Sequence, residues 1–111
     1  MATQSTAARQ RFGDFAPKLV ELTDGVLFDD VWERDELSPR DRSLVTITAL
    51  AALYRTDQIE FHLRKGLDNG LTKDELVEAI THLAFYAGWP AAMTAMNTLK
   101  TIVERAEDDI G

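Results

Sequence analysis

Apolar residues recur at three- and four-residue intervals along most of the chain, the spacing of helices with one buried face. The most apolar stretch follows a helix start, with Ser38 as the cap, Pro39 at the first helical position and Asp41 three residues after the cap. Residues 43–54 then carry no charge and are apolar on nearly every side. We therefore expect a helix over 39–54 that is buried on most of its faces.

Stop and start signals divide the rest of the chain into further helices. Gly25 and Gly88 are stops, Pro90 occupies a first helical position, and Thr72 with Glu75 forms a capping box. No alternating segment is long enough for a strand. The chain is expected to be all-α, a compact orthogonal bundle of five or six helices that cover about residues 16–24, 39–54, 57–69, 73–87 and 90–107, with a short helix or helical turn over 26–36.

A length of 111 residues predicts one domain over 1–111. Residues 1–10 are small and polar, so we expect a frayed end and a core within 26–107. Hydrophobic residues make up 45% of the chain, which is enough for a core. A small domain nevertheless leaves much of its surface exposed, and an apolar helix such as 43–54 is hard to cover in a monomer. We therefore expect the chain to associate with itself.

The formal net charge of −7 argues against nucleic acid as a partner and against a basic membrane-binding surface. A small anionic substrate stays possible, because a few local arginines can outweigh the global sign. No apolar run is long enough to span a bilayer, and the first residues lack the apolar core of a signal peptide, so we expect a cytoplasmic protein. The chain has no cysteine, which excludes disulfides, thiolate metal sites and cysteine nucleophiles.

His62 is the first candidate for chemistry, because it lies within the apolar stripe of its helix. An unperturbed imidazole titrates near neutrality and suits general acid–base catalysis. A hydrogen-bonded core or interface histidine is the alternative. Gly66, one turn further on, leaves space in which a ligand or another helix could approach closely.

His82 is the second candidate. Glu78, His82 and Tyr86 follow one another at intervals of one helical turn, beside the main apolar stripe. A glutamate at this spacing can orient the imidazole ring, and Tyr86 can add a hydroxyl. From the residues alone we favour a solvated or interface polar face.

Two arginines lie in the first turn of the helix over 39–54, where cations oppose the helix dipole. The compensating acid is expected to be Asp41, the acidic residues within 29–36 or a substrate carboxylate. Arg42 directly precedes the apolar run and is favoured over Arg40 to point inward. No HxxxH or HExxH spacing supports a metal site, and no glycine-rich phosphate loop is present, so we expect neither metal nor cofactor.

Several spaced motifs together resemble the carboxymuconolactone decarboxylase family, which also contains the alkylhydroperoxidase D type of enzyme. The similarity covers roughly residues 26–100, including Val31-Trp32, and its motifs are Arg42-Ser43-Leu44-Val45-Thr46, His62-Leu63-Arg64, Asn69-Gly70-Leu71-Thr72-Lys73-Asp74-Glu75-Leu76, His82 and Tyr86-Ala87-Gly88-Trp89-Pro90-Ala91-Ala92. This resemblance implies an alkylhydroperoxidase D-like fold that assembles as a homotrimer or homohexamer.

The peroxidase branch of the family uses a glutamate followed by Cys-x-x-Cys-x-x-x-His. Placed on His62, that pattern requires cysteines at Arg55 and Gln58 and a glutamate at Ser43, none of which is present. A thiol peroxidase cannot operate without a thiol. We therefore reject that activity.

The decarboxylase branch needs no cysteine and acts on 4-carboxymuconolactone in aromatic catabolism. The resemblance implies a cofactor-free decarboxylation, or related lyase or isomerase chemistry, of a small anionic lactone or carboxylic acid. His62 would then move the proton, and Arg42 would hold a carboxylate or the developing anion. The residues that would line the substrate pocket are His82, Tyr86, Trp32 and Gln58.

Gln58 is a departure from the decarboxylases, which carry an acidic residue four positions before the histidine. The chain could accordingly act on another small acid or lactone. The alternative is a non-catalytic paralogue that binds a small ligand. On the catalytic interpretation we expect His62 to face a cavity near a subunit interface.

Overall fold

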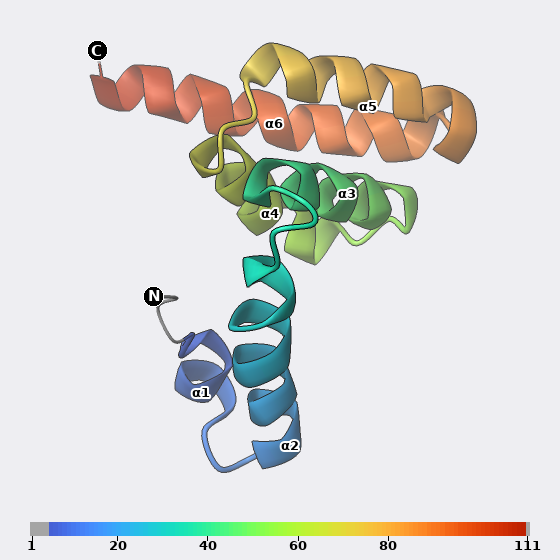
Figure 1. Cartoon of the computed structure of the whole chain (residues 1–111). Helices are drawn as coiled ribbons and strands as arrows, with labels where there is room; N and C mark the ends of the chain where they lie inside the picture. Colours follow the sequence, from blue (N-terminus) through green and yellow to red (C-terminus); the bar gives the residue numbers. More distant parts are fainter. Residues whose placement is uncertain (1–4, 111) are drawn as a thin grey trace. The chain divides into compact units, whose positions relative to one another are not determined.

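The computed structural model describes residues 5–110, and within that range it contains helices and no strand, which confirms the all-α prediction. The elements are α1 (Ala7–Phe12), α2 (Pro17–Val20), the π-helix η1 (Glu21–Phe28), the 3-10 helix η2 (Val31–Glu33), α3 (Pro39–Ala52), α4 (Thr56–Asp68), α5 (Lys73–Ala87) and α6 (Trp89–Ile110), as Figure 1 shows. None of these helices combines the length and apolarity that crossing a membrane requires.

The chain divides into two compact units, Met1–Pro39 and Arg40–Gly111. The expected single domain over 1–111 stays a prediction. The units differ in their organisation, because the first contains only short helices and the second is built from four helices of 13 to 22 residues.

In the N-terminal unit, a single carboxylate fixes the start of α1. Asp24 is buried and accepts hydrogen bonds from the amides of Ala8 and Arg9, each at 3.0 Å, and from the Ser5 hydroxyl at 3.0 Å. Burial raises the pKa of Asp24, but these hydrogen bonds outweigh burial and hold the pKa below its ordinary value of 3.8. A carboxylate here also suits the positive end of the helix dipole. We expected residues 1–10 to be frayed; 1–4 lie outside the described residues, and α1 begins at Ala7.

The prediction that Gly25 stops a helix was wrong. The chain passes through Gly25 in η1, where the amide of Asp29 reaches the Asp24 carbonyl five residues back, at 3.1 Å. The short helix or helical turn expected over 26–36 is observed as the end of η1 and the single turn of η2. Gly25 has an ordinary negative φ, so the helical backbone can continue through this residue.

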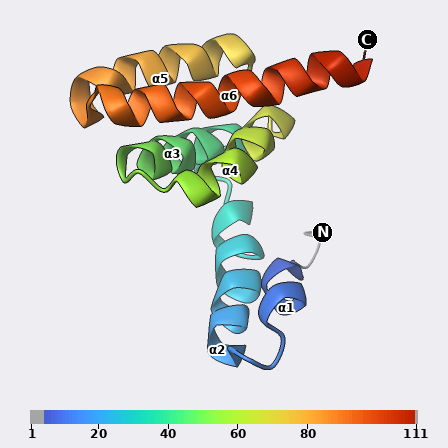
Figure 2. The same cartoon turned by 180° about the vertical axis from the view of Figure 1, so that it is seen from behind.

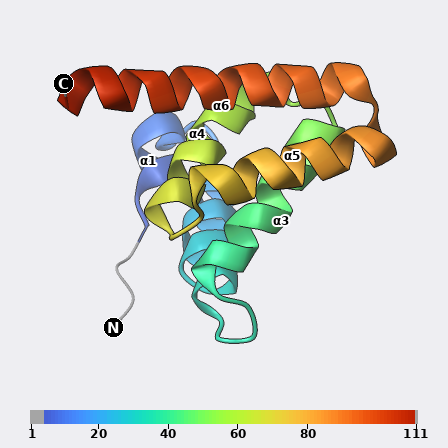
Figure 3. The same ribbon diagram turned by 90° about the horizontal axis from the view of Figure 1, so that it is seen from above.

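The C-terminal unit consists of two helical hairpins packed together. α5 and α6 lie side by side and converge at their connecting turn, and the hairpin of α3 and α4 lies against them (Figures 1, 2 and 3). Between the hairpins is the core: Ile47, Ala51, Ile59, Leu63, Leu71, Leu76, Ile80, Ala84, Ala92, Ala95, Leu99 and Ile102. Most of these residues recur every three or four positions within their helices, as the pattern predicted.

The prediction that the helix over 39–54 is buried on most faces was wrong for the single chain. Its buried stripe is Ser43, Ile47 and Ala51, whereas Val45 is 60% exposed and Leu53 is 66% exposed. Ile47 and Ser43 of this stripe lie beside Gly66 of α4, so one face of α3 is covered there and an evenly apolar helix leaves large side chains on its other faces in water.

Gly66 of α4 lies in close contact with α3. A Cβ added at this position would lie 2.8 Å from Cδ1 of Ile47, 3.0 Å from Cδ1 of Leu71 and 3.6 Å from Cβ of Ser43. Of the two uses of Gly66 that the sequence allowed, the structure has the second: another helix, not a ligand, fills the space beside it. The side-chain amide of Asn69 strengthens the contact by donating a hydrogen bond to Ser43 Oγ at 2.9 Å.

Three helix ends in the C-terminal unit show known capping motifs, namely the start of α5 and the ends of α4 and α3. The predicted capping box of Thr72 and Glu75 at the start of α5 is confirmed in both its hydrogen bonds. α4 ends in a Schellman motif with Gly70 at φ 106° in the position that follows the cap. α3 ends in the same motif, but Tyr54 occupies that position at φ 58°. A left-handed conformation is costly for a tyrosine.

Candidate functional site

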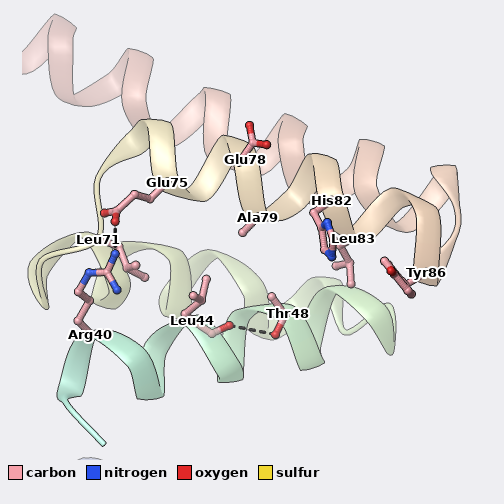
Figure 4. A pocket seen from close by; sticks show the side chains of 10 residues that line it. All are labelled: Arg40, Leu44, Thr48, Leu71, Glu75, Glu78, Ala79, His82, Leu83 and Tyr86. Carbon is pink, nitrogen blue, oxygen red and sulfur yellow. Dashed lines mark hydrogen bonds and ion pairs between the residues drawn. The ribbon is translucent and has the colours of Figure 1, made fainter.

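The clearest hollow in the C-terminal unit lies between α3 and α5, and we call it the α3–α5 pocket (Figure 4). Its volume is about 670 Å³, which suits a small organic molecule or several large side chains. The apolar lining is Leu44, Leu71, Ala79 and Leu83, and the polar lining is Arg40, Thr48, Glu75, Glu78, His82 and Tyr86.

One end of this pocket is closed by an ion pair. Arg40 donates hydrogen bonds to Glu75 on α5 and to the neighbouring Asp41, the latter at 2.8 Å. These hydrogen bonds, first the one to Glu75 and then the one to Asp41, raise the pKa of Arg40 above its ordinary value. The compensation expected for a cation at this helix start is thus supplied by Asp41, one of the three candidates that the sequence offered, and by Glu75, which the sequence did not identify.

The other end of the α3–α5 pocket carries His82 and Tyr86, whose ring centroids lie 5.0 Å apart. Both side chains are exposed to solvent, as is Glu78 on the same helix. The one-turn spacing predicted for these three residues is confirmed, and it places all three at the pocket.

The ionic groups of this pocket do not favour an anion. Arg40 is neutralised by Glu75 and Asp41, and Glu78 adds a further carboxylate. A small anion would have to displace a carboxylate from Arg40 before it could bind there. The lining instead favours an apolar occupant that offers hydrogen-bond donors to Glu78.

His62 occupies a different position, on α4 beside the buried residues Ile59, Leu63 and Gly66. The ring is half-buried, and Phe61 contacts it edge-on at 5.0 Å between centroids. Burial, and then the charge of Lys65, lower the pKa of His62 below its ordinary value of 6.5. The imidazole is therefore neutral at pH 7.

The Nδ1 atom of His62 is buried, and no hydrogen-bond partner for it exists among the described residues. Buried polar atoms in folded proteins nearly always have a partner, so such an atom calls for a ligand, an ordered water or a functional role. The alternative interpretation, that His62 is a hydrogen-bonded core histidine, lacks support because Nδ1 forms no hydrogen bond with a described residue. A neutral ring with a free nitrogen fits proton transfer.

The other predicted site residues are distributed over both units. Arg42 is half-buried on α3 but is not part of the α3–α5 pocket, whereas Arg40 is. Gln58 is exposed in the first turn of α4. Trp32 belongs to the N-terminal unit, where its ring centroid lies 6.4 Å from that of Phe28. The catalytic roles of His62 and Arg42 and the substrate-binding roles of His82, Tyr86, Trp32 and Gln58 stay predictions.

Sequence reasoning missed Arg40, Thr48 and Glu75 as pocket residues. It favoured Arg42 over Arg40 to point inward, and the Arg42 Nε atom is indeed buried. Glu75 had a visible signal, the capping box, but that signal indicates a helix start and does not reveal an arginine 35 positions earlier. Within residues 5–110, no three histidine, aspartate or glutamate side chains gather as a metal site would require.

Comparison with known proteins is consistent with the motifs in the chain. Residues 17–101 match the model of the carboxymuconolactone decarboxylase family, and this match includes parts of both units. Over 93 residues, 84% of this chain and 69% of the relative, the chain is 40% identical to a protein of Acinetobacter baylyi named 4-carboxymuconolactone decarboxylase.

A second relative is the protein of Metarhizium robertsii named nitrosuccinic acid decarboxylase npaB, with 32% identity over 81 residues. That alignment covers 69% of this chain but only 57% of the relative. Both relatives are named decarboxylases, which supports a carboxy-lyase function of the family type.

Proposed function

The chain belongs to the carboxymuconolactone decarboxylase family, and on that premise we propose that it decarboxylates a small anionic lactone or carboxylic acid without a cofactor. The observation that carries the proposal is the half-buried, neutral His62, whose Nδ1 atom is buried without a partner among the described residues. The names of the two relatives supply the reaction type and two compounds to test.

Decarboxylation breaks the carbon–carbon bond to a carboxylate. The electron pair stays on the substrate carbon, CO₂ leaves, and that carbon then takes up one proton. A lactone carbonyl and a nitro group can both delocalise the electron pair, which is the property that the two named compounds share. The substrate class is therefore a small acid with such a group close to its carboxylate.

In this proposal His62 delivers the proton. Its imidazole is neutral at pH 7 in the free protein, because burial and Lys65 disfavour the charged form. An anionic substrate beside the ring would favour the imidazolium and so load the proton that the reaction consumes. Arg42, half-buried on α3, is proposed to hold a carboxylate or the developing anion.

The test is CO₂ release from 4-carboxymuconolactone and, separately, from nitrosuccinic acid. The wild type should turn over at least one of them, and His62→Gln should lower kcat by about 10²-fold or more, as loss of a proton donor does elsewhere. Asp68→Asn, at an exposed position on the same helix, should retain full activity. Equal turnover by wild type and His62→Gln would remove His62 from the mechanism.

A non-catalytic, ligand-binding paralogue is the second candidate, and Gln58 is the observation that favours it. The family's decarboxylases carry an acid at this position, and Gln58 is exposed at the start of α4. Calorimetry distinguishes the two candidates. Heat of binding without CO₂ release from either compound would favour the paralogue, and release of CO₂ would reject it.

A further inference from the structure

Polar side chains follow one side of α4 from its first cap to its last, and His62 is one of them. The members of this line, which we call the α4 polar line, are Arg55, Gln58, His62, Lys65 and Asn69. They follow one another at intervals of three, four, three and four residues, so they share one side of the helix. The line contains two cations and no acid, in a chain whose formal net charge is −7. The charge on this side of α4 is therefore opposite in sign to that of the whole chain.

The acidic residues of α4 lie outside the α4 polar line. Glu60 lies on the opposite side of the helix, where it pairs with Arg64 across one turn at 3.7 Å. Asp68 follows Lys65 by three residues, a spacing at which a helical ion pair can form, yet no ion pair joins these two side chains. The positive charge of Lys65 is thus not neutralised from within α4.

Lys65 is the cation of this line that is partly withdrawn from solvent. Within residues 40–109, three cationic residues are half-buried, namely Arg40, Arg42 and Lys65. Arg40 is paired with Glu75 and Asp41, and Arg42 is already proposed to hold the developing anion. The ammonium group of Lys65 forms no hydrogen bond or ion pair with any residue of the described range 5–110. Partial burial of a charge costs free energy unless an opposite charge compensates, and a bound anion would supply that charge.

Lys65 is also close to His62. The two residues are three positions apart on α4, which corresponds to a rise of roughly 4.5 Å along the helix axis. The charge of Lys65 contributes to the lowered pKa of His62, so the ammonium group lies close enough to act on the ring. An anionic group bound to Lys65 would therefore be joined by a short carbon chain to an atom that His62 protonates.

We propose that Lys65 binds a second carboxylate of the substrate, one that stays on the molecule after CO₂ has left. This inference rests on the proposed function, because it takes His62 as the proton donor. In the reaction one carbon–carbon bond breaks, a carbon–hydrogen bond forms at the same carbon with the proton from His62, and the second carboxylate is unchanged. The ligand class is a small diacid whose acid groups are separated by one or two carbons.

The retained carboxylate suits Lys65 better than the carboxylate that is lost. A cation on the departing group stabilises the ground state, and this interaction disappears as neutral CO₂ forms, so it would slow the reaction. A cation on the retained group acts equally before and after bond breaking. Lys65 would thus contribute to affinity and to the choice of substrate, whereas His62 and Arg42 act on the reacting atoms.

The alternative is that Lys65 only covers apolar surface with its carbon chain, while the ammonium group lies in solvent. Two substitutions separate these roles. Methionine keeps most of the apolar cover and removes the charge, whereas arginine keeps both the cover and the charge.

Succinate and butanoate are the matched probes, because a carboxylate of the first is replaced by a methyl group in the second. Binding is followed by nuclear magnetic resonance of the His62 imidazole; the chain has two histidines, and His62→Gln identifies the signal. The wild type should bind succinate about 10-fold more tightly than butanoate or better, as one hydrogen bond between charged groups provides.

Lys65→Met should lose the preference for succinate and keep the wild-type affinity for butanoate. Lys65→Arg should retain the preference. Lys73→Met is the matched control, because it removes the same charge from an exposed position on α5, and it should behave as the wild type. An unchanged preference in Lys65→Met would overturn the proposal, and so would a wild type that does not prefer succinate, including one that binds neither probe.

Titration of His62 without any ligand is a second test. Lys65→Met removes a positive charge beside the ring, so the midpoint of the imidazole should rise towards 6.5, with an unchanged far-ultraviolet circular dichroism spectrum. An unchanged midpoint would place the ammonium group away from the ring and overturn the proposal. Neither test uses CO₂ release. Failure of both named compounds to release CO₂ would reject the proposed function, whereas loss of the succinate preference would reject the role of Lys65, so the two failures are distinguishable.

Discussion

Arg40 of α3 forms an ion pair with Glu75 of α5, and the same carboxylate closes the capping box that starts α5. One glutamate therefore joins the two hairpins of the C-terminal unit and also satisfies an amide at a helix start. Glu75→Gln keeps a cap, because a glutamine oxygen can also accept from the Thr72 amide, but it removes the charge. Glu75→Ala removes both.

We expect the melting temperature to fall in the order wild type, Glu75→Gln, Glu75→Ala, with the larger step at alanine. Both partners of the ion pair are more than one third exposed, so the charge contributes little in salt. The fall in melting temperature from wild type to Glu75→Gln should shrink in 1 M salt, where the Debye length is about 3 Å. The further fall from Glu75→Gln to Glu75→Ala should remain, because it reflects loss of the cap. Thermal unfolding at low and high salt tests this, and a larger loss at glutamine would contradict it.

Gly66→Ala should destabilise the protein. Overpacking a closed core costs about 1–3 kcal/mol, and the better helix propensity of alanine returns about 1 kcal/mol, which leaves a net loss of about 1 kcal/mol. Urea unfolding measures the loss. Adding Ile47→Val removes the methyl group that lies 2.8 Å from the new Cβ and should recover part of it.

Gly25→Ala is the matched control for Gly66→Ala. A Cβ at Gly25 meets no heavy atom within 4 Å, and its φ is negative. Alanine should leave the free energy of unfolding unchanged or raise it by up to about 1 kcal/mol, because it reduces the conformational entropy of the unfolded chain. A loss at Gly25 as large as that at Gly66 would show that close packing of α4 on α3 is not the cause.

Tyr54→Gly should stabilise the turn between α3 and α4. The left-handed conformation of Tyr54 costs a side chain about 1–2 kcal/mol, which glycine avoids. The substitution also removes a weak hydrogen bond, which Thr94 Oγ1 donates to the tyrosine hydroxyl at 3.3 Å. We therefore expect the free energy of unfolding to rise by about 1 kcal/mol in total.

Two further variants separate these contributions. Tyr54→Phe removes only the hydrogen bond and should be slightly less stable than the wild type. Gly70→Ala puts a side chain at φ 106°, in the same position of the motif that ends α4, and should be destabilising by about 1 kcal/mol or more. If Tyr54→Gly were less stable than Tyr54→Phe, the contacts of the ring, and not the backbone conformation, would determine the stability of this turn.

His62 gives the stability of the protein a dependence on pH with a definite sign. Its pKa is lower in the folded protein than the ordinary value of 6.5. As the pH falls below 6.5, the unfolded chain binds a proton before the folded one does, so stability declines until the lowered folded pKa is reached. Above 6.5 this contribution is constant.

The measurement is the urea midpoint as a function of pH between 7.5 and 4.5 for the wild type and His62→Gln. The variant should lose part of the decline below about pH 6.5. Direct titration of the imidazole by nuclear magnetic resonance should show a midpoint below that value. A midpoint above 6.5 would contradict the dominance of burial and Lys65 over other influences on this ring.

Much of the fold could be predicted from the sequence, because its signals are local. The start of α5 follows from Thr72 and Glu75, three residues apart, and the end of α4 follows from Gly70. The spacing of apolar residues gave the buried stripes of α4, α5 and α6. The prediction failed at Gly25 because glycine permits a helix stop without requiring one.

The candidate site was less predictable, because its contacts join distant parts of the chain. The sequence places His62 within the apolar stripe of α4, but it does not show that Nδ1 is buried without a partner among the described residues. It also does not show that Arg40 pairs with a glutamate on another hairpin. Which of the two arginines forms that ion pair depends on which one the second hairpin approaches.

The sequence by itself determined that this chain is helical, where most of its helices begin and end, and that no thiol chemistry is possible. These properties depend on residues within one or two turns of each other, or on composition. Only the tertiary structure decided that Glu75 meets Arg40, that Gly66 admits α3, and that α5 presents a hollow beside exposed rings. Such features arise when separate helices pack, since packing selects among side chains that local spacing leaves equivalent.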